Sequence, residues 1–338
     1  MTPYCTPNGS LSVDPDGADG GIQGQEQFAK NIGLIYLCLG FITIPICCFV
    51  LSVICRPPLI KHSCYKLMSF TTVFDIINLF NASIVYGFFS IQNIHHCNSG
   101  MWVSYVVQQL MFVWMVYCCA SEVLALNRML EFANKNLAIF LFEGKRVYIW
   151  FGVCFAYAIA GVLLVPDKFY FYNTYGGYVS MNRLHGEPNI VHIFNNFFKF
   201  GFLTITYTLM LFFMYRRLRT SDTSRISSFQ IKVSIQTLAI AGLGDAVTVG
   251  YLAIGYAPLS PEVAAYAGLV GELLWIALHG GTGIIYMIMN NAVNRRLRAA
   301  FCGATPIAPT EASHTEAPKK PSVIQPMKPS LLSVTSTA

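Results

Sequence analysis

The feature that most constrains this chain is a series of seven apolar runs, each long enough to cross a lipid bilayer as an α-helix. A crossing needs about 20 predominantly apolar residues, because the hydrocarbon core is about 30 Å thick. Helices are required because an unpaired backbone amide is costly in lipid, and the alternating pattern of membrane β-strands is absent. The fold class predicted is an all-α integral membrane protein, a seven-transmembrane helix bundle. The runs occupy 31–55, 67–91, 101–126, 147–166, 191–215, 232–256 and 264–289.

The composition excludes a soluble protein of this length. Of the 338 residues, 54% are hydrophobic and only 11% are charged, whereas soluble domains carry about 25% charged residues to wet their surface. The net charge of +6 does not indicate a nucleic-acid partner, because the basic residues fall in short clusters between the apolar runs. Lipid is the solvent that fits this surface.

The distribution of basic residues gives the orientation in the membrane. Eighteen of the 22 Lys and Arg residues follow spans one, three, five and seven, and three lie in the amino-terminal segment and the other loops. Loops rich in Lys and Arg stay in the cytosol. The amino terminus is therefore predicted to be extracellular and the carboxyl tail cytosolic.

Three segments flank the 31–289 transmembrane domain. Residues 1–30 are acidic and Gly-rich, lack the apolar core of a cleavable signal peptide and are expected to have no fixed structure; Asn8 begins a glycosylation sequon there. Residues 290–302 are expected to form an amphipathic basic helix on the inner leaflet, in contact with anionic lipid. Its Cys302 is either a palmitoylation site or a free thiol. The tail 303–338, rich in Pro, Ser and Thr, is expected to be disordered.

Two cysteines fall clearly outside the cell in this topology. Cys5 lies in the amino-terminal segment and Cys97 at the mouth of the third span, and the loop between spans four and five has none. If the protein has an extracellular disulfide, these two are the available pair. The alternative is a free Cys5.

Ionisable residues inside a membrane are costly, so each is a functional candidate. At 1.5 Å per residue, Lys199, Asp245 and Glu272 fall at similar depths in the outer half of spans five, six and seven. They are expected either to pair, with Lys199 binding one of the acids, or to contact a polar ligand group. Asp75 and Glu122 lie deeper in spans two and three.

Asp75 is expected to bind sodium, to hold a water network or to anchor polar neighbours such as Asn78. Arg128 ends the third span, where the physical pattern alone favours a snorkelling arginine at the cytosolic edge. No enzyme, cofactor or metal centre is indicated. The seven His residues are scattered, and neither His192 nor His279 has a second ligand at helical spacing.

Local strings make the pattern more specific. SCYKLM (63–68) enters the second span, LALNR (124–128) ends the third, FEGKRVYIW (142–150) leads into the fourth, and Ile284, Ile285, Tyr286 and Asn290 close the seventh. Together with the seven helices, these strings resemble the nematode serpentine chemoreceptors of class T (Srt), a family of G-protein-coupled receptors. The resemblance runs from about residue 60 to residue 300.

Two departures from related receptors affect the predicted switch, formed by Asn127, Arg128 and Tyr286. Rhodopsin-like receptors have an acid before the arginine, and Asn127 stands there in this chain. The restraint on Arg128 is therefore expected to be weaker than in those receptors or to come from another residue. Thr282 and Gly283 occupy the place where a proline is expected, so a kink in the seventh helix would depend on glycines.

The resemblance implies a chemosensory receptor in the plasma membrane, including that of sensory cilia, that binds a small molecule such as an odorant and signals to a heterotrimeric G protein. A small-solute transporter or ligand-gated channel is the alternative, although no internal repeat supports it. The expected ligand contacts lie in the outer halves of spans three, five, six and seven: Tyr105, Gln108, Gln109, Phe112, Asn195, Asn196, Lys199, Asp245 and Glu272.

Overall fold

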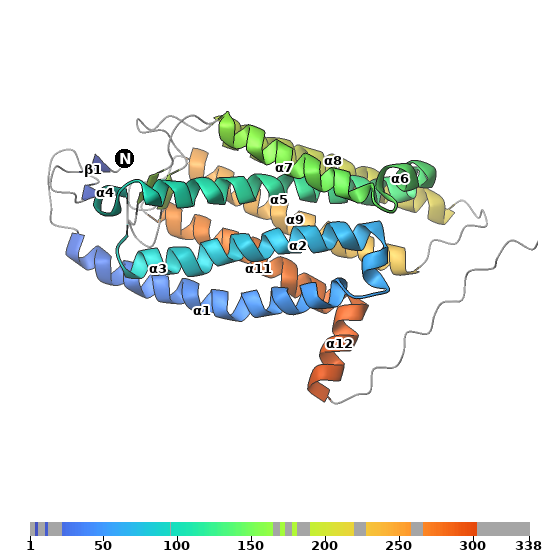
Figure 1. Cartoon of the computed structure of the whole chain (residues 1–338), viewed down its shortest axis with the longest axis horizontal. Coiled ribbons are helices and arrows are strands. Elements are labelled where there is room, and N and C mark those ends of the chain that lie inside the picture. The colour runs from blue at the N-terminus through green and yellow to red at the C-terminus, as the bar shows by residue number, and fades with distance from the viewer. Residues whose placement is uncertain are drawn as a thin grey trace, which may run out of the picture.

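A computed structural model describes residues 4–5, 11–12, 22–94, 96–164, 170–172, 178–180, 190–219, 228–257 and 266–302. Long helices lie side by side in one bundle, and α12 leaves its end at a steep angle (Figure 1). The long helices are α1 (Ile22–Ile54), α2 (Ser63–Phe80), α5 (Trp102–Ala133), α7 (Val147–Leu163), α8 (Ile190–Arg219), α9 (Ser228–Tyr256) and α11 (Ala267–Met289). The short elements are β1 (Tyr4–Cys5), β2 (Leu11–Ser12), η2 (Leu59–Lys61), η3 (Asn81–Val85), α3 (Tyr86–Ile91), α4 (His96–Ser99), α6 (Lys135–Phe142), β3 (Tyr170–Tyr172), β4 (Tyr178–Ser180) and α12 (Asn291–Cys302).

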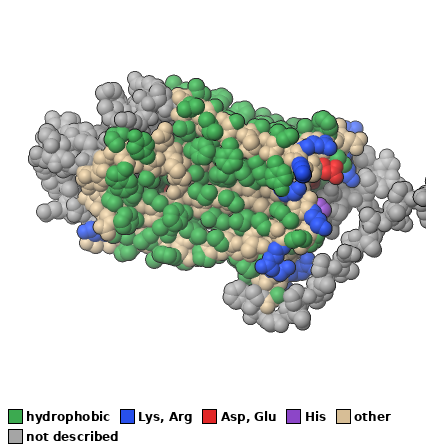
Figure 2. All heavy atoms as spheres, in the orientation of Figure 1, with side chains coloured by type: hydrophobic (Ala, Val, Ile, Leu, Met, Phe, Trp, Pro, Cys, Tyr) green, Lys and Arg blue, Asp and Glu red, His purple; other side chains and the backbone are tan. Residues whose placement is uncertain are grey.

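The seven-span architecture predicted from the sequence is confirmed. Among the described residues, six helical units are long and apolar enough to cross a bilayer. The seventh is the pair α6 and α7, which meet at a bend of 70°. Lys and Arg side chains gather at the end that carries α12, while apolar side chains cover the side of the bundle (Figure 2). This distribution matches a lipid-facing belt with a cytosolic end.

Several helices extend beyond the spans predicted from the apolar runs. α1 begins at Ile22, inside the segment expected to have no fixed structure, and β1 pairs antiparallel with β2 in the same segment. α5 continues to Ala133, past the predicted end at residue 126. A run of apolar residues marks only the part of a helix that lies in the hydrocarbon core. The backbone hydrogen bonds of the same helix continue beyond it into the aqueous region. The second span also contains a π-helical segment, η3, before it resumes as α3.

The cytosolic helix α6 has no counterpart in the sequence prediction. Asn134 caps it, because its side-chain oxygen accepts a hydrogen bond from the Leu137 amide at 3.1 Å. The chain then turns through Gly144, whose φ of 68° suits glycine, and enters α7. The fourth span is therefore shorter at its inner end than a single straight helix would be.

Close helix contacts fix the outer part of the bundle. A Cβ added at Gly33 of α1 would lie 2.7 Å from the Gly87 oxygen of α3, so only glycine permits this crossing. In α11 a Cβ at Gly283 would lie 2.5 Å from the Cys47 sulfur of α1. The seventh-helix glycine that was expected to supply a kink thus serves close packing.

Candidate functional site

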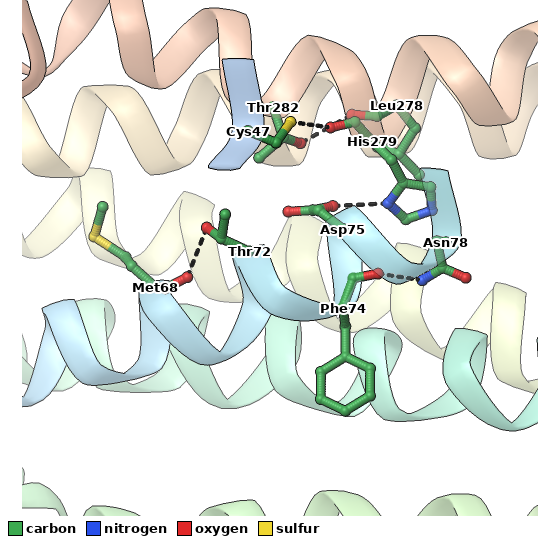
Figure 3. Close-up of polar contacts among 9 residues, drawn as sticks. All are labelled: Cys47, Met68, Thr72, Phe74, Asp75, Asn78, Leu278, His279 and Thr282. Atoms are coloured by element: carbon green, nitrogen blue, oxygen red, sulfur yellow. Dashed lines mark hydrogen bonds and ion pairs between the residues drawn. The ribbon is translucent and has the colours of Figure 1, made fainter. Parts of the chain in front are cut away.

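Asp75 of α2 and His279 of α11 form a buried pair at the centre of the bundle. His279 Nδ1 lies 2.7 Å from Asp75 Oδ1, so a single proton lies between them, and both residues are at most 1% exposed. Cys47 of α1 donates a hydrogen bond from its sulfur to the His279 carbonyl at 3.7 Å (Figure 3). Together with Cys47, the pair connects α1, α2 and α11. Sequence reasoning found Asp75 but missed His279 as its partner, although both are buried ionisable groups.

Lys199 of α8 lies in an aromatic box rather than in an ion pair. Its Nζ is 4.4 Å from the ring centre of Trp114 and 4.8 Å from that of Tyr117, both on α5. Lys199 is 2% exposed, and its Nζ has no hydrogen-bond partner in the described part of the chain. A desolvated ammonium gains about 2 kcal/mol or more over an aromatic face. The box therefore offsets part of the cost of burying this charge.

Lys199 forms no ion pair with Asp245 or Glu272 in the described part of the chain, although Lys199 and Asp245 lie close enough to interact electrostatically. Asp245 Oδ2 accepts a hydrogen bond from Thr204 at 3.3 Å on the exposed flank between α8 and α9. Glu272 is 8% exposed, and its Oε1 has no partner among the described residues. Counting residues along a helix gives depth but not the direction that a side chain faces. The three groups share a level and face different neighbours.

Asn195 and Asn196 tie α8 to α5 and α7 one turn above Lys199. Asn195 accepts a hydrogen bond from Tyr157 of α7 at 2.8 Å and donates to the Cys118 sulfur at 3.3 Å. Asn196 accepts from the Trp114 indole nitrogen at 3.1 Å. Both amides therefore face neighbouring helices, and Asn196 also holds the ring that forms the wall of the Lys199 box.

The expected ligand contacts on the third span lie away from this box. Tyr105 is 64% exposed on the lipid-facing surface, and half-buried Gln108 and exposed Gln109 flank it. The Gln109 side chain accepts a hydrogen bond from Asn81, and Phe112 stacks on Phe155 of α7. The sequence does not distinguish the faces of this helix, because apolar residues surround it. The inward face is the one that carries Trp114 and Tyr117.

Below the box lies a partly open cavity of about 30 Å³ with both polar and apolar walls, which is room for about one or two water molecules. Asp75 and Lys199 both line it, and Asp75 Oδ2 has no partner in the described residues. Glu122 lies close enough to Lys199 to interact electrostatically. Water held here would join the Asp75–His279 pair to the Lys199 ammonium. The other lining residues are Thr71, Tyr117, Ser121, Leu124, Leu203, Tyr207, Thr237, Ile240, Ala241, Gly244, Thr282 and Tyr286.

The cavity ends beside a buried arginine at the cytosolic side. Arg128 is only 3% exposed, so its interpretation as a snorkelling interfacial arginine is wrong. α5 extends beyond it, and Glu131, one turn further, binds Arg128 Nη1 at 2.8 Å. Neither side-chain polar atom of Asn127 has a partner among the described residues. The acid beside this arginine therefore comes from the turn after it rather than from the residue before it.

Tyr286 and Asn290 connect this region to α12. Tyr286 is buried and lies within electrostatic range of Arg128. The Asn290 oxygen accepts hydrogen bonds from the Ala292 and Val293 amides at the start of α12, and its nitrogen donates to Tyr65 of α2 at 3.3 Å. Asn290 therefore fixes the turn between α11 and α12. Side chains of Cys5, Cys97 and Cys302, and all of Asn8, lie outside the described residues, so the disulfide, palmitoylation and glycosylation stay predictions.

The overall arrangement is that of a known receptor fold. The structure matches a crystal structure of squid rhodopsin with a TM-score of 0.59, at 9% identity, over 82% of this chain and 86% of that one. At this identity the likeness concerns the fold alone.

Sequence comparison gives the family. A curated relative, serpentine receptor class T-55 of Caenorhabditis elegans, is 22% identical over 245 residues, which are 70% of this chain. The matched region spans 64% of that relative's length. The family model described as "Serpentine type 7TM GPCR chemoreceptor Srt" matches residues 22–308, which is most of the chain. The chain belongs to the Srt family of seven-transmembrane serpentine chemoreceptors.

Proposed function

We propose that this chain is a chemosensory receptor that binds a small molecule in the outer half of its bundle and activates a heterotrimeric G protein. The observation that carries the proposal is the Lys199 box. A buried ammonium without a hydrogen-bond partner among the described residues lies at the top of this cavity, and Tyr286, beside Arg128, lies at the bottom. A ligand that moves Lys199 thereby changes the surroundings of the cytosolic switch.

The ligand would bind just outside the box, between α5, α8, α9 and α11. Trp114 and Trp275 lie 4.5 Å apart between ring centres, and Tyr251 lies edge-on to Trp275. Glu272, one turn above Trp275, and Asn196 add polar groups. The hairpin β3–β4 contacts α5 and α11 at this outer end. Such a site, aromatic with a few polar groups, suits a small, mainly apolar molecule.

Signalling requires that the ligand favour one of two helix arrangements. In the arrangement described here, Glu131 restrains Arg128. In the other, Arg128 leaves Glu131 and α9 moves at its inner end, which opens a surface for the G protein. The basic residues in the last turn of α8, Arg216, Arg217 and Arg219, would then meet the transducer. We place the receptor in the plasma membrane and, with sensory function, in the cilia of sensory neurons.

A reconstitution experiment tests this function. The full-length chain in lipid nanodiscs, mixed with purified G proteins and screened against volatile and water-soluble small molecules, should accelerate nucleotide exchange for an active compound. Lys199→Met should abolish that response. Asp245→Asn also removes a charge at this depth, but Asp245 is bonded to Thr204 and interacts with Lys199 only electrostatically, so this variant should reduce the response less than Lys199→Met. Ligand-gated current or solute uptake without a G protein would overturn the proposal in favour of a channel or transporter.

A further inference from the structure

A groove at the cytosolic end of the bundle has properties that the proposed signalling does not use. Its volume is about 670 Å³, within the range of roughly 300–1,000 Å³ typical of small-ligand sites. It lies between α9, the end of α11 and α12, with η2 and α2 behind it. Its lining residues are Leu59, Tyr65, Lys232, Gln236, Ile288, Met289, Asn290, Asn291, Ala292, Asn294, Arg295 and Arg298.

The charge of this groove is of one sign. Lys232 comes from α9, and Arg295 and Arg298 from one face of α12. The described lining contains neither Asp nor Glu, and no described residue forms an ion pair with these three. Side-chain amides and the Tyr65 hydroxyl supply further hydrogen-bonding groups. Three convergent cations with neutral polar groups recognise a multiply charged anion such as a phosphate ester.

The position of the groove identifies the source of that anion as lipid. Ile288 lines the groove and is 66% exposed, on the apolar outer surface of the bundle. α12 leaves the bundle at the end where basic side chains gather (Figures 1 and 2). One side of the groove therefore faces acyl chains while its floor is basic, at the depth of inner-leaflet headgroups.

The groove is distinct from the surface around Arg128. No described residue of α5 or α8 lines it. Its occupant would instead connect the start of α9 to α12, because Lys232 and the two arginines lie on opposite walls. We propose that the groove binds the headgroup of a polyphosphorylated phospholipid of the inner leaflet, which bridges α9 and α12.

Binding of a labelled lipid to the full-length chain tests this site directly. The probe is phosphatidylinositol bisphosphate at a few per cent in phosphatidylcholine nanodiscs, measured by native mass spectrometry and fluorescence. Arg295→Gln with Arg298→Gln should weaken binding about tenfold or more, and Lys232→Gln should weaken it severalfold. Arg296→Gln is the matched control. It removes the same charge from the same helix, but Arg296 does not line the groove, so it should change binding by less than about twofold.

Three outcomes would overturn the proposal. Equal losses for the Arg296 variant and the groove variants would mean that only general charge attracts the lipid. Unchanged binding for Lys232→Gln would remove the bridge to α9. Binding of soluble inositol trisphosphate as tightly as the lipid would make a soluble metabolite the occupant. Thermal unfolding of each variant, expected to match the parent, separates lost contacts from lost folding, and no G protein is needed in any measurement.

Discussion

Two parts of the bundle differ in how they are held together. α5 lies at the centre, and 72% of its most apolar stretch is buried, whereas α1, α8 and α9, at the periphery, each bury 28% of theirs. The apolar cores then separate α1 from α8 and α9. The larger apolar core draws most of its buried residues from α1, α2, α5, α7 and α11, with a few from η3, α3, α6 and α12, and with Val247 alone from α9. A second, smaller core joins α8 and α9 to the inner end of α5. We call the first part the body and the pair α8–α9 the flank.

The boundary between body and flank is mixed, because the smaller apolar core crosses it at the inner end and polar contacts cross it above that core. Lys199, Asn195 and Asn196 meet α5 there, the cavity lies between the two parts, and Tyr207 lies near Arg128. Hydrogen bonds and cation–π contacts can exchange partners with less loss than a close-packed apolar surface, which has few alternative arrangements. We therefore expect α8 and α9 to shift against the body mainly where these polar contacts lie.

The largest predicted effect lies in the body. Asp75→Ala should lower the free energy of unfolding by about 3–5 kcal/mol, because it leaves His279 buried without its partner. Thermal or chemical unfolding in detergent measures this loss. Asp75→Asn keeps an acceptor and should cost less, and Asp245→Ala, in the flank, should cost under about 1 kcal/mol. Equal losses for Asp75→Ala and Asp245→Ala would remove the distinction between body and flank.

The next effect lies at the boundary. Trp114→Leu should destabilise the parent by about 2 kcal/mol more than it destabilises the Lys199→Met variant. In the parent the substitution removes an aromatic face from the Lys199 ammonium, whereas the Lys199→Met variant has no ammonium to lose that contact. A double-mutant cycle in unfolding measurements gives this coupling. Trp102→Leu makes the same change at an exposed position of the same helix and should show no coupling to Lys199→Met. A coupling near zero at Trp114 would show that the box does not stabilise the charge.

Sequence reasoning predicted the spans and their direction because length, hydropathy and charge bias are properties of single segments. It also found Asp75, Lys199 and Arg128, since a buried charge is conspicuous in an apolar run. It failed where the answer depends on the direction a side chain faces. Tyr105 faces lipid and half-buried Asp245 faces Thr204 of α8, and α5 and α9 carry no periodic signal that reveals this. The partners His279 and Glu131 required the packing of helices and the true end of α5.

The smallest predicted effect concerns the switch at the inner end of the boundary. Glu131 is 21% exposed, so its pair with Arg128 is worth about 1 kcal/mol or less. Glu131→Gln should therefore raise ligand-independent nucleotide exchange about two- to fivefold by releasing Arg128 from the arrangement described here. The measurement is basal exchange in nanodiscs, with Glu143→Gln as a control for lost cytosolic charge, since Glu143 is exposed at the end of α6. A higher basal exchange rate with an unchanged unfolding temperature would show that Arg128 is released at the boundary between body and flank. An unchanged basal rate would mean that the flank is restrained elsewhere, with the Lys199 box as the remaining contact that a ligand must break.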